Sequence, residues 1–139
     1  MSIDDVIADF ALLDDWEDRY RYIIELGRTL TRLNQSERTD ATKIRGCASQ
    51  VWLVSEKQII NNNTEDPTFT FRGESDAHIV QGLIAILLRI YSGKRASQIL
   101  EVDAISIFDS LGLNEHLSSQ RANGLRSMIA RIKKDAAAV

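Results

Sequence analysis

Apolar residues recur every three or four positions through the first part of the chain, which is typical of amphipathic helices. Ser2 and Asp5 resemble a capping box at the start of the first such stretch, with aspartate in place of the usual glutamate. A second stretch, predicted to be helical from Trp16 to Leu33, follows Asp14 and Asp15, which are suited to cap it. Two helices are therefore expected before residue 34. The apolar positions of the first are Val6, Ile7, Phe10 and Leu13.

The period changes from helical to alternating after residue 50. The segment from Val51 to Lys57 begins with apolar residues on both faces, which predicts a strand buried on both sides at its start and exposed on one side toward its end. Asn61–Asn63 favours a turn, because asparagine tolerates the left-handed conformation. Pro67 marks the start of a second alternating segment, in which Phe69 and Phe71 share one face. A small antiparallel meander of two or three strands is predicted.

A broadly apolar helix follows, and we expect it to be central. Ser75 is predicted to cap it, with Asp76 favourably placed in its first turn. Ser92-Gly93 ends it. Apolar side chains cover more than half of its circumference, so it should touch both the sheet and other helices. They are Ile79, Val80, Leu83, Ile84, Ile86, Leu87, Ile90 and Tyr91.

The remainder of the chain is helical in pattern. Two short helices are predicted at Ala96–Leu100 and Ala104–Leu111, and Gly112 is a fitting C-terminal stop for the second. The last helix is expected to start after Ser118 and to run to about Lys134. We expect Ala136–Val139 to be frayed.

Length and composition indicate one globular domain. A chain of 139 residues with 44% apolar and 27% charged residues can bury a real core. No repeat or linker divides it, so residues 1–139 are expected to form a single α+β domain, a small antiparallel β-sheet packed by helices. The net charge is −3, and basic residues are spread along the sequence, which argues against nucleic acid as a partner.

The sequence also bears on location. The acidic N-terminus lacks the cationic and apolar regions of a signal peptide. No apolar run approaches the roughly 18 residues of a membrane span, so no membrane partner is expected. A single cysteine cannot form an internal disulfide, which fits a reducing compartment. A cytoplasmic location is therefore the expectation.

The only cysteine, Cys47, is the main candidate for chemistry. Lys43 and Arg45 precede it, and cationic neighbours favour the nucleophilic thiolate by lowering the thiol pKa. Gly46 permits a positive φ or a close approach by another element. The competing interpretation is a small buried hydrophobe, inert in a helical interaction module. The residues alone leave both open.

A second class of function is a cysteine-dependent hydrolase or acyl transferase. His116, with Asn123 or Asp109, could complete a cysteine–histidine–acid arrangement with Cys47. The spacing does not demand it, and solvated or capping roles suit both His116 and His78. One cysteine and two distant histidines also lack the ligand spacing of a zinc site, so no metal is expected.

Three further residues suggest close contacts or a partner. Arg121 falls in the first turn of the last helix, where a cation opposes the helix macrodipole. An anion, a thiolate loop or a partner's carboxylate would explain it, and so would a side chain that reaches solvent. Gly27 and Gly124 lie within predicted helices, where glycine is unfavourable, so each is expected to pack closely against a neighbour.

Four ordered segments, spread over nearly the whole chain, resemble the SufE family of sulfur-acceptor proteins. Together they are a far more specific signal than any one of them alone. In the cysteine loop Ala48 stands where the family often has glutamine, which leaves Cys47 undisturbed. The matching segments are Asp15–Tyr20 continuing through Tyr22–Gly27, Arg45–Trp52, Ser75–Ala85, and His116–Ser118 with Arg121–Leu125.

The resemblance implies a fold similar to that of IscU-type scaffold proteins. It implies that Cys47 accepts persulfide sulfur from a pyridoxal-phosphate cysteine desulfurase, stimulates that enzyme, and passes the sulfur on for iron–sulfur cluster assembly. The chain would then be an activating partner rather than an enzyme and would need no cofactor, since the pyridoxal phosphate belongs to the desulfurase. Support of the loop or contact with the partner would fall to Arg45, Gly46, Ser49, Gln50, Asp76 and Arg121.

This chemistry agrees with the residues. Transfer of a persulfide sulfur is the same elementary step as thiol–disulfide exchange and needs one nucleophilic thiol. A second cysteine would discharge the persulfide as an internal disulfide, and the chain has none. We expect a mobile loop that withdraws Cys47 behind apolar side chains near Val51–Val54. The motifs do not separate SufE-like from CsdE-like members, so a SufS-like or CsdA-like desulfurase, the final acceptor, and a monomer or homodimer all stay open.

Overall fold

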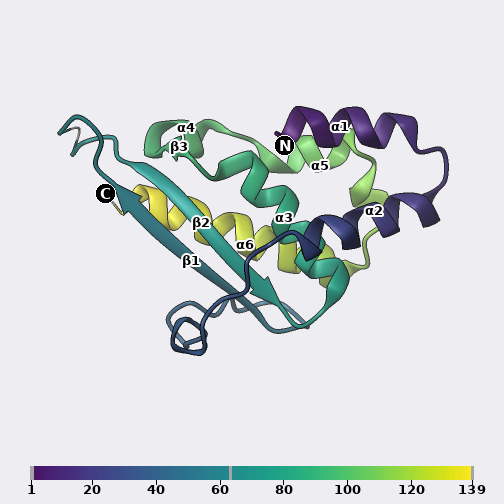
Figure 1. Ribbon diagram of the computed structural model, residues 1–139, viewed down its shortest axis with the longest axis horizontal. Helices are drawn as coiled ribbons and strands as arrows, with labels where there is room; N and C mark the ends of the chain where they lie inside the picture. The colour runs from purple at the N-terminus through teal and green to yellow at the C-terminus, as the bar shows by residue number, and fades with distance from the viewer. Residues whose placement is uncertain (1, 63, 139) are drawn as a thin grey trace.

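The computed structural model describes residues 2–62 and 64–138. Its class is α+β, as predicted, with one antiparallel sheet of strand order β1-β2-β3 and helices packed against it (Figure 1). Helix α3 lies between α2 and strand β2, and α6 contacts β1, α3 and α4. The elements are α1 (Ile3–Leu12), α2 (Trp16–Arg28), η1 (Gln35–Glu37), β1 (Val51–Gln58), β2 (Thr68–Ser75), α3 (His78–Tyr91), β3 (Lys94–Arg95), α4 (Ala96–Glu101), α5 (Ala104–Ser110), η2 (Leu113–Glu115) and α6 (Ser119–Ala137).

Both N-terminal helices begin where the sequence predicts. The Ser2–Asp5 capping box is formed, and the Asp15 side chain accepts a hydrogen bond from the first turn of α2. The predicted end of α2 at Leu33 was wrong, because the helix stops at Arg28. Leu33 is buried, but it enters the core from a non-helical segment whose backbone N–H donates to the Glu74 carboxylate, 3.0 Å away. The spacing of apolar residues therefore continues past the end of α2, which is why the sequence predicted a longer helix.

Strands β1 and β2 form the predicted hairpin. Their register runs from Val51 opposite Ser75 to Gln58 opposite Thr68. Asn61 and Asn62 in the connecting turn have φ of 56° and 60°, the left-handed conformation expected of them, while Asn63 lies outside the described residues. The third strand, β3, pairs with β2 only after α3 has intervened, so the three strands are not consecutive in the chain.

Side chains on β1 alternate more clearly than predicted. Val51 and Leu53 are buried, whereas Trp52 and Val54 are only half-buried, so the start of the strand is not fully covered on both sides. The segment 33–44 contacts part of the outer face, where Glu37 and Arg38 bond Arg72 and Glu74 of β2. Phe69 and Phe71 of β2 are both buried on one face, as expected, with ring centroids 6.1 Å apart.

Helix α3 is the centre of the core, as its sequence predicts, but it starts later than expected. Its N-cap is Ala77, which makes no side-chain cap hydrogen bond. Ser75 is instead the last residue of β2, where it is buried. Its hydroxyl accepts from the Ala77 backbone N–H, and its own N–H donates to the side chain of Gln81. Ser75 therefore closes the strand-to-helix turn rather than capping the helix.

Two glycines fix how closely α2 and α3 pack. A Cβ placed on Gly27 would lie 2.7 Å from the backbone N of Gly82, and one on Gly82 would lie 2.2 Å from the carbonyl oxygen of Ile23. Real Cβ atoms do not approach so closely, so the two backbones are in direct contact here. The close packing expected for Gly27 is confirmed.

The C-terminal helices follow their predicted limits within a few residues. Gly112 ends α5 with φ of 74°, as expected of a stop signal. Ser118 caps α6 by accepting from the Arg121 backbone N–H. The predicted fraying from Ala136 was wrong, because α6 continues to Ala137 and Ala136 is buried in the core; Val139 lies outside the described residues. Within the described part of the chain, no helix is long and apolar enough to cross a membrane.

Candidate functional site

The loop that carries Cys47 runs from Ile44 to Val51 and is tied down at its first end. The Ile44 N–H donates to the Val51 carbonyl oxygen, so the loop closes back on the start of β1. Gly46 has φ of 90°, and a Cβ on it would lie 2.6 Å from the Ser127 hydroxyl of α6. Both reasons foreseen for a glycine at this position, positive φ and close approach, are present.

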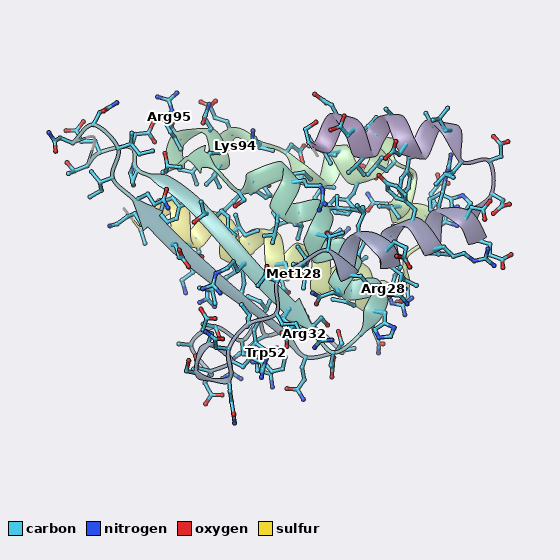
Figure 2. All side chains as sticks on the ribbon, in the orientation of Figure 1. Arg28, Arg32, Trp52, Lys94, Arg95 and Met128 are labelled. Carbon is cyan, nitrogen blue, oxygen red and sulfur yellow. The ribbon has the colours of Figure 1, made fainter. Side chains whose placement is uncertain are left out.

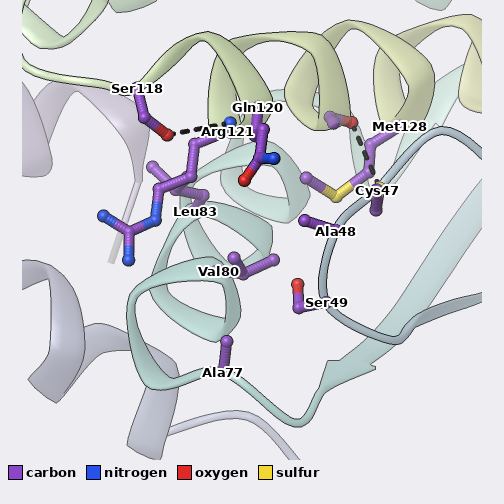
Figure 3. A pocket seen from close by; sticks show the side chains of 11 residues that line it. Cys47, Ala48, Ser49, Ala77, Val80, Leu83, Ser118, Gln120, Arg121 and Met128 are labelled. Atoms are coloured by element: carbon purple, nitrogen blue, oxygen red, sulfur yellow. Dashed lines mark hydrogen bonds between the residues drawn. The ribbon is translucent and has the colours of Figure 1, made fainter.

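Cys47 packs directly on the backbone of α6. Its side chain is half-buried, and Sγ donates to the Gly124 carbonyl oxygen over 3.7 Å, the dashed contact beside Met128 in Figure 3. A Cβ on Gly124 would lie 3.2 Å from that Sγ. The tight packing expected at Gly124 is confirmed, and the atom that it accommodates is the thiol.

Burial, and not charge, sets the acidity of this thiol. Desolvation raises the pKa of Cys47 above its ordinary value. The prediction that Lys43 and Arg45 lower it was wrong. Arg45 is exposed to solvent, while Lys43 pairs with Trp52 across the edge of β1. Two cations close in sequence therefore do not act on the sulfur, and the resting thiol is held protonated at neutral pH.

A cavity of about 370 Å³ opens beside Cys47, between its loop, α3 and the start of α6 (Figure 3). One side of it is apolar, with Val80 and Leu83 from α3 and Met128 from α6. Gln120 and Arg121 line it from the first turn of α6. The pattern of the chain places the apolar residues in the core but gives no signal that they border a cavity.

Three of the residues predicted to support the loop meet at its second end. The Gln50 N–H donates to the Asp76 carboxylate over 3.0 Å, and the Asp76 N–H donates to the Gln50 carbonyl oxygen over 3.3 Å. The hydroxyl of Ser49 lies 3.5 Å from that of Ser75. The turn between β2 and α3 thus clasps the Cys47 loop. The predicted place of Asp76 in the first turn of α3 was wrong, because the residue precedes the N-cap Ala77 and its carboxylate binds the loop instead.

Arg121 shares the cavity with Cys47, although 74 positions separate them in the printed sequence. Its side chain lies at the side of the cavity away from Cys47, with the guanidinium beyond Ser118 (Figure 3). It is exposed and makes no side-chain hydrogen bond or ion pair with the rest of the described chain. Its cation is therefore available to a group from outside.

The histidines occupy structural or solvent positions. The His116 ring stacks on Trp16 with centroids 3.6 Å apart, and its carbonyl oxygen accepts from the Tyr20 hydroxyl over 2.6 Å. No hydrogen bond joins it to Cys47 in the part of the chain that the structure describes. Asp109 accepts from the Asn114 side chain instead. His78 is exposed at the first position of α3.

Within residues 2–62 and 64–138, no group of three or more histidine, cysteine, aspartate or glutamate side chains is placed to hold a metal ion.

Fold and site together define a small α+β protein with one sheltered thiol beside a cavity. The family described as SufE, Fe-S metabolism associated domain, matches residues 4–136. An uncharacterized SufE-like protein of Rhizobium meliloti strain 1021 is 62% identical over 135 residues, which cover 97% of this chain and 94% of that protein. One of Rhizobium etli is 56% identical over 135 residues, covering 97% and 89%. The chain belongs to the SufE family.

A solved structure supports the fold. The solution structure of a hypothetical protein from Thermus thermophilus matches with a TM-score of 0.73 and covers 99% of this chain and 97% of that one. At 15% sequence identity this likeness shows a shared fold.

Proposed function

We propose that Cys47 is a sulfur acceptor, which takes the outer sulfur of a persulfide from a pyridoxal-phosphate cysteine desulfurase and holds it for iron–sulfur cluster assembly. In this role the chain is a carrier and activator rather than an enzyme, and the pyridoxal phosphate is the partner's. The observation that carries the proposal is the seat of Cys47 on Gly124 next to a partly apolar cavity, in a chain of the SufE family.

The transfer balances without an added oxidant. The Cys47 sulfur attacks the outer sulfur of the donor persulfide, a new S–S bond forms, and the donor's S–S bond breaks. The electron pair of the broken bond leaves on the donor sulfur, which takes up the proton that Cys47 gives up. One persulfide and one thiol are consumed, and one thiol and one persulfide are produced.

The raised pKa of Cys47 assigns the partner a part in this step. A protonated thiol is a poor nucleophile, so at rest the protein reacts slowly with stray electrophiles. Release of the loop from Asp76 and Gly124 would bring Cys47 into a more polar setting, where its pKa falls toward the ordinary value. Stimulation of the desulfurase then follows from removal of its persulfide, which frees the donor cysteine for another turnover.

The geometry does not favour the alternative, a cysteine-dependent hydrolase or acyl transferase. It requires His116 as the base for Cys47, and the His116 ring is stacked on Trp16. Its distinguishing prediction is turnover of an ester or amide that depends on both residues.

Mass spectrometry of the intact protein tests the proposal. After incubation with a cysteine desulfurase from the same genome and free cysteine, the chain should gain one sulfur atom, and Cys47→Ser should gain none while keeping its circular dichroism spectrum. The variant His116→Phe, which can retain an aromatic stack on Trp16, serves as the control and should gain sulfur as the wild type does. An unchanged mass for the wild-type chain would overturn the proposal.

A further inference from the structure

A second cavity lies on the other side of the first turn of α3. It measures about 210 Å³ and is bordered by the end of α2 and by His78 and Gln81 of α3. Ala77 and Val80, from the same turn, line the Cys47 cavity instead. The two cavities are therefore neighbours that share one helical turn as a wall.

Positive charge dominates this second cavity. The guanidinium groups of Arg28 and Arg32 line it, beside the imidazole of His78, and none of its described lining residues is acidic. Arg32 is exposed and makes no ion pair or hydrogen bond within the described chain. Arg28 pairs with Glu25, but both side chains are about two-thirds exposed, at 66% and 64%, so the pair is weak and easily exchanged.

One polar group in the wall of the second cavity, the side-chain oxygen of Gln81, is already paired. The Ser75 N–H donates to the Gln81 side-chain oxygen over 2.6 Å. The floor is rigid, because Gly27 contacts the backbone of Gly82 and leaves no room for a side chain. The two arginines are the charged groups of this cavity that can meet a ligand, and they select for negative charge.

The size and position of the second cavity limit which ligands it can bind. Pockets for drug-sized molecules measure roughly 300–1,000 Å³, so this one suits a single side chain or a small ion. Arg28 and Arg32 lie at the end of the molecule opposite Lys94 and Arg95 (Figure 2), and this is the end that holds α3's first turn and the Cys47 loop. The second cavity therefore lies next to the surface that a protein must approach to reach Cys47.

We propose that the cavity bounded by Arg28, Arg32 and His78 binds a carboxylate side chain of the protein that exchanges sulfur with Cys47. The site is a docking point: it fixes the partner beside the Cys47 loop without touching the reacting sulfurs. This proposal rests on the proposed function, which supplies the identity of the partner.

A connection to the loop follows from the hydrogen bonds already described. Gln81 of the second cavity binds Ser75, Ser75 approaches Ser49 in the loop, and the adjacent Asp76 clasps Gln50. A carboxylate held by the arginines would therefore lie beside the turn that is hydrogen-bonded to the loop.

Binding to a purified cysteine desulfurase from the same genome tests the site, with titration calorimetry as the readout. The double variant Arg28→Glu/Arg32→Glu should raise Kd about tenfold or more, as expected for loss of charge-assisted docking contacts. The matched control is Lys57→Glu/Lys134→Glu, which makes the same change of net charge on exposed residues outside both cavities. It should change Kd by about twofold or less.

The outcomes separate this site from the acceptor role of Cys47. Equal Kd values for the two double variants would overturn the docking site even where Cys47 still gains sulfur. Normal binding of the wild type without sulfur gain would overturn the acceptor role alone. No binding of the wild type overturns the partner assignment of the site.

A free small anion is the other ligand that Arg28 and Arg32 could bind. Titration of the wild type with inorganic phosphate, followed by NMR at the His78 and Gln81 amides, should not saturate below about 10 mM, as expected for two exposed arginines without further contacts. Saturation at micromolar phosphate would show a site for a free small anion and would overturn the docking assignment.

Discussion

At the scale of single residues, Cys47 and Gly124 form one unit. The thiol occupies the space that any other residue at position 124 would need, since a Cβ there would lie 3.2 Å from Sγ. Glycine within a helix costs roughly 1 kcal/mol relative to alanine, so α6 gives up stability to seat the sulfur. The missing Cβ of Gly124 in α6 therefore leaves the space that the Cys47 thiol occupies.

Gly124→Ala should therefore displace Cys47. We expect faster alkylation by iodoacetamide and a net loss of about 1 kcal/mol in the free energy of unfolding, because crowding at the thiol outweighs the gain in helix propensity. In a Cys47→Ala background the crowding is relieved, and the same change should stabilise the protein by up to about 1 kcal/mol. Urea unfolding of the four proteins of this cycle measures both effects; additive effects would contradict a direct contact.

The acidity of Cys47 gives a second prediction. Because burial raises its pKa, the thiolate is scarce at neutral pH and increases as pH rises through the raised value. The rate of alkylation against pH should therefore reach its midpoint above that of cysteine in a short peptide. A midpoint equal to or below that of the peptide would mean that the thiol is neither buried nor protonated at rest.

At the scale of elements, the turn from β2 to α3 acts as a clasp. Asp76 is exposed, yet its carboxylate and backbone N–H both bind Gln50, which adds a local restraint to a loop that the start of β1 and the contact of Cys47 with Gly124 also hold. The residues just before α3 thus contribute to how freely the loop of Cys47 moves.

Asp76→Ala should release the loop. We expect a loss of about 1 kcal/mol in unfolding free energy, less than is usual for a hydrogen bond to an ionised group because the site is exposed. Alkylation of Cys47 should be several-fold faster. Asp40→Ala, which removes an exposed aspartate without such a bond to the described part of the loop, is the control and should leave the rate unchanged. Equal alkylation rates for the two variants would show that the bonds between Asp76 and Gln50 do not restrain the loop.

The segment 33–44 is fastened to the outer face of the sheet by charge. Glu37 bonds Arg72 of β2, and Arg72 also bonds Glu56 of β1, while Arg38 bonds the buried carboxylate of Glu74. The Arg72 guanidinium, and then the Asn34 N–H, lower the pKa of Glu37 from 4.5 to about 2. Folding thus favours the ionised form of Glu37.

This shift predicts how stability depends on pH. The folded state holds the Glu37 proton less tightly than the unfolded chain, so its contribution is present above about pH 4.5 and is lost as pH falls toward 2. Glu37→Gln should flatten the decline of unfolding free energy across this window. The matched variant Glu101→Gln, at an exposed carboxyl without an ion pair to the described residues, should decline in parallel with the wild type.

At the scale of the whole molecule, the sequence pattern predicted correctly those features that depend on interactions between residues close together in the chain. The caps at Ser2, Asp15 and Ser118, the turn at Asn61 and the class of the fold all follow from neighbours along the chain. The end of α2 and the role of Ser75 did not, because tertiary contacts with Glu74 and Gln81 decide them.

The candidate site divides in the same way. Cys47, Gly46 and Asp76 could be singled out from residue type and motif. The cavity could not, since its walls come from a loop, α3 and α6, which meet only in the fold. The acidity of the thiol was predicted with the wrong sign for the same reason: sequence shows that Arg45 is near but not that it is exposed to solvent.

The contact between Cys47 and Gly124 spans 77 positions and has a consequence for biosynthesis. The ribosome makes the thiol well before it makes the helix that covers it, since α6 follows every other described element. For that interval Cys47 is an ordinary exposed thiol on an incomplete fold, open to oxidants and to stray disulfides. The newly made chain therefore depends on its surroundings for protection that the finished protein supplies itself.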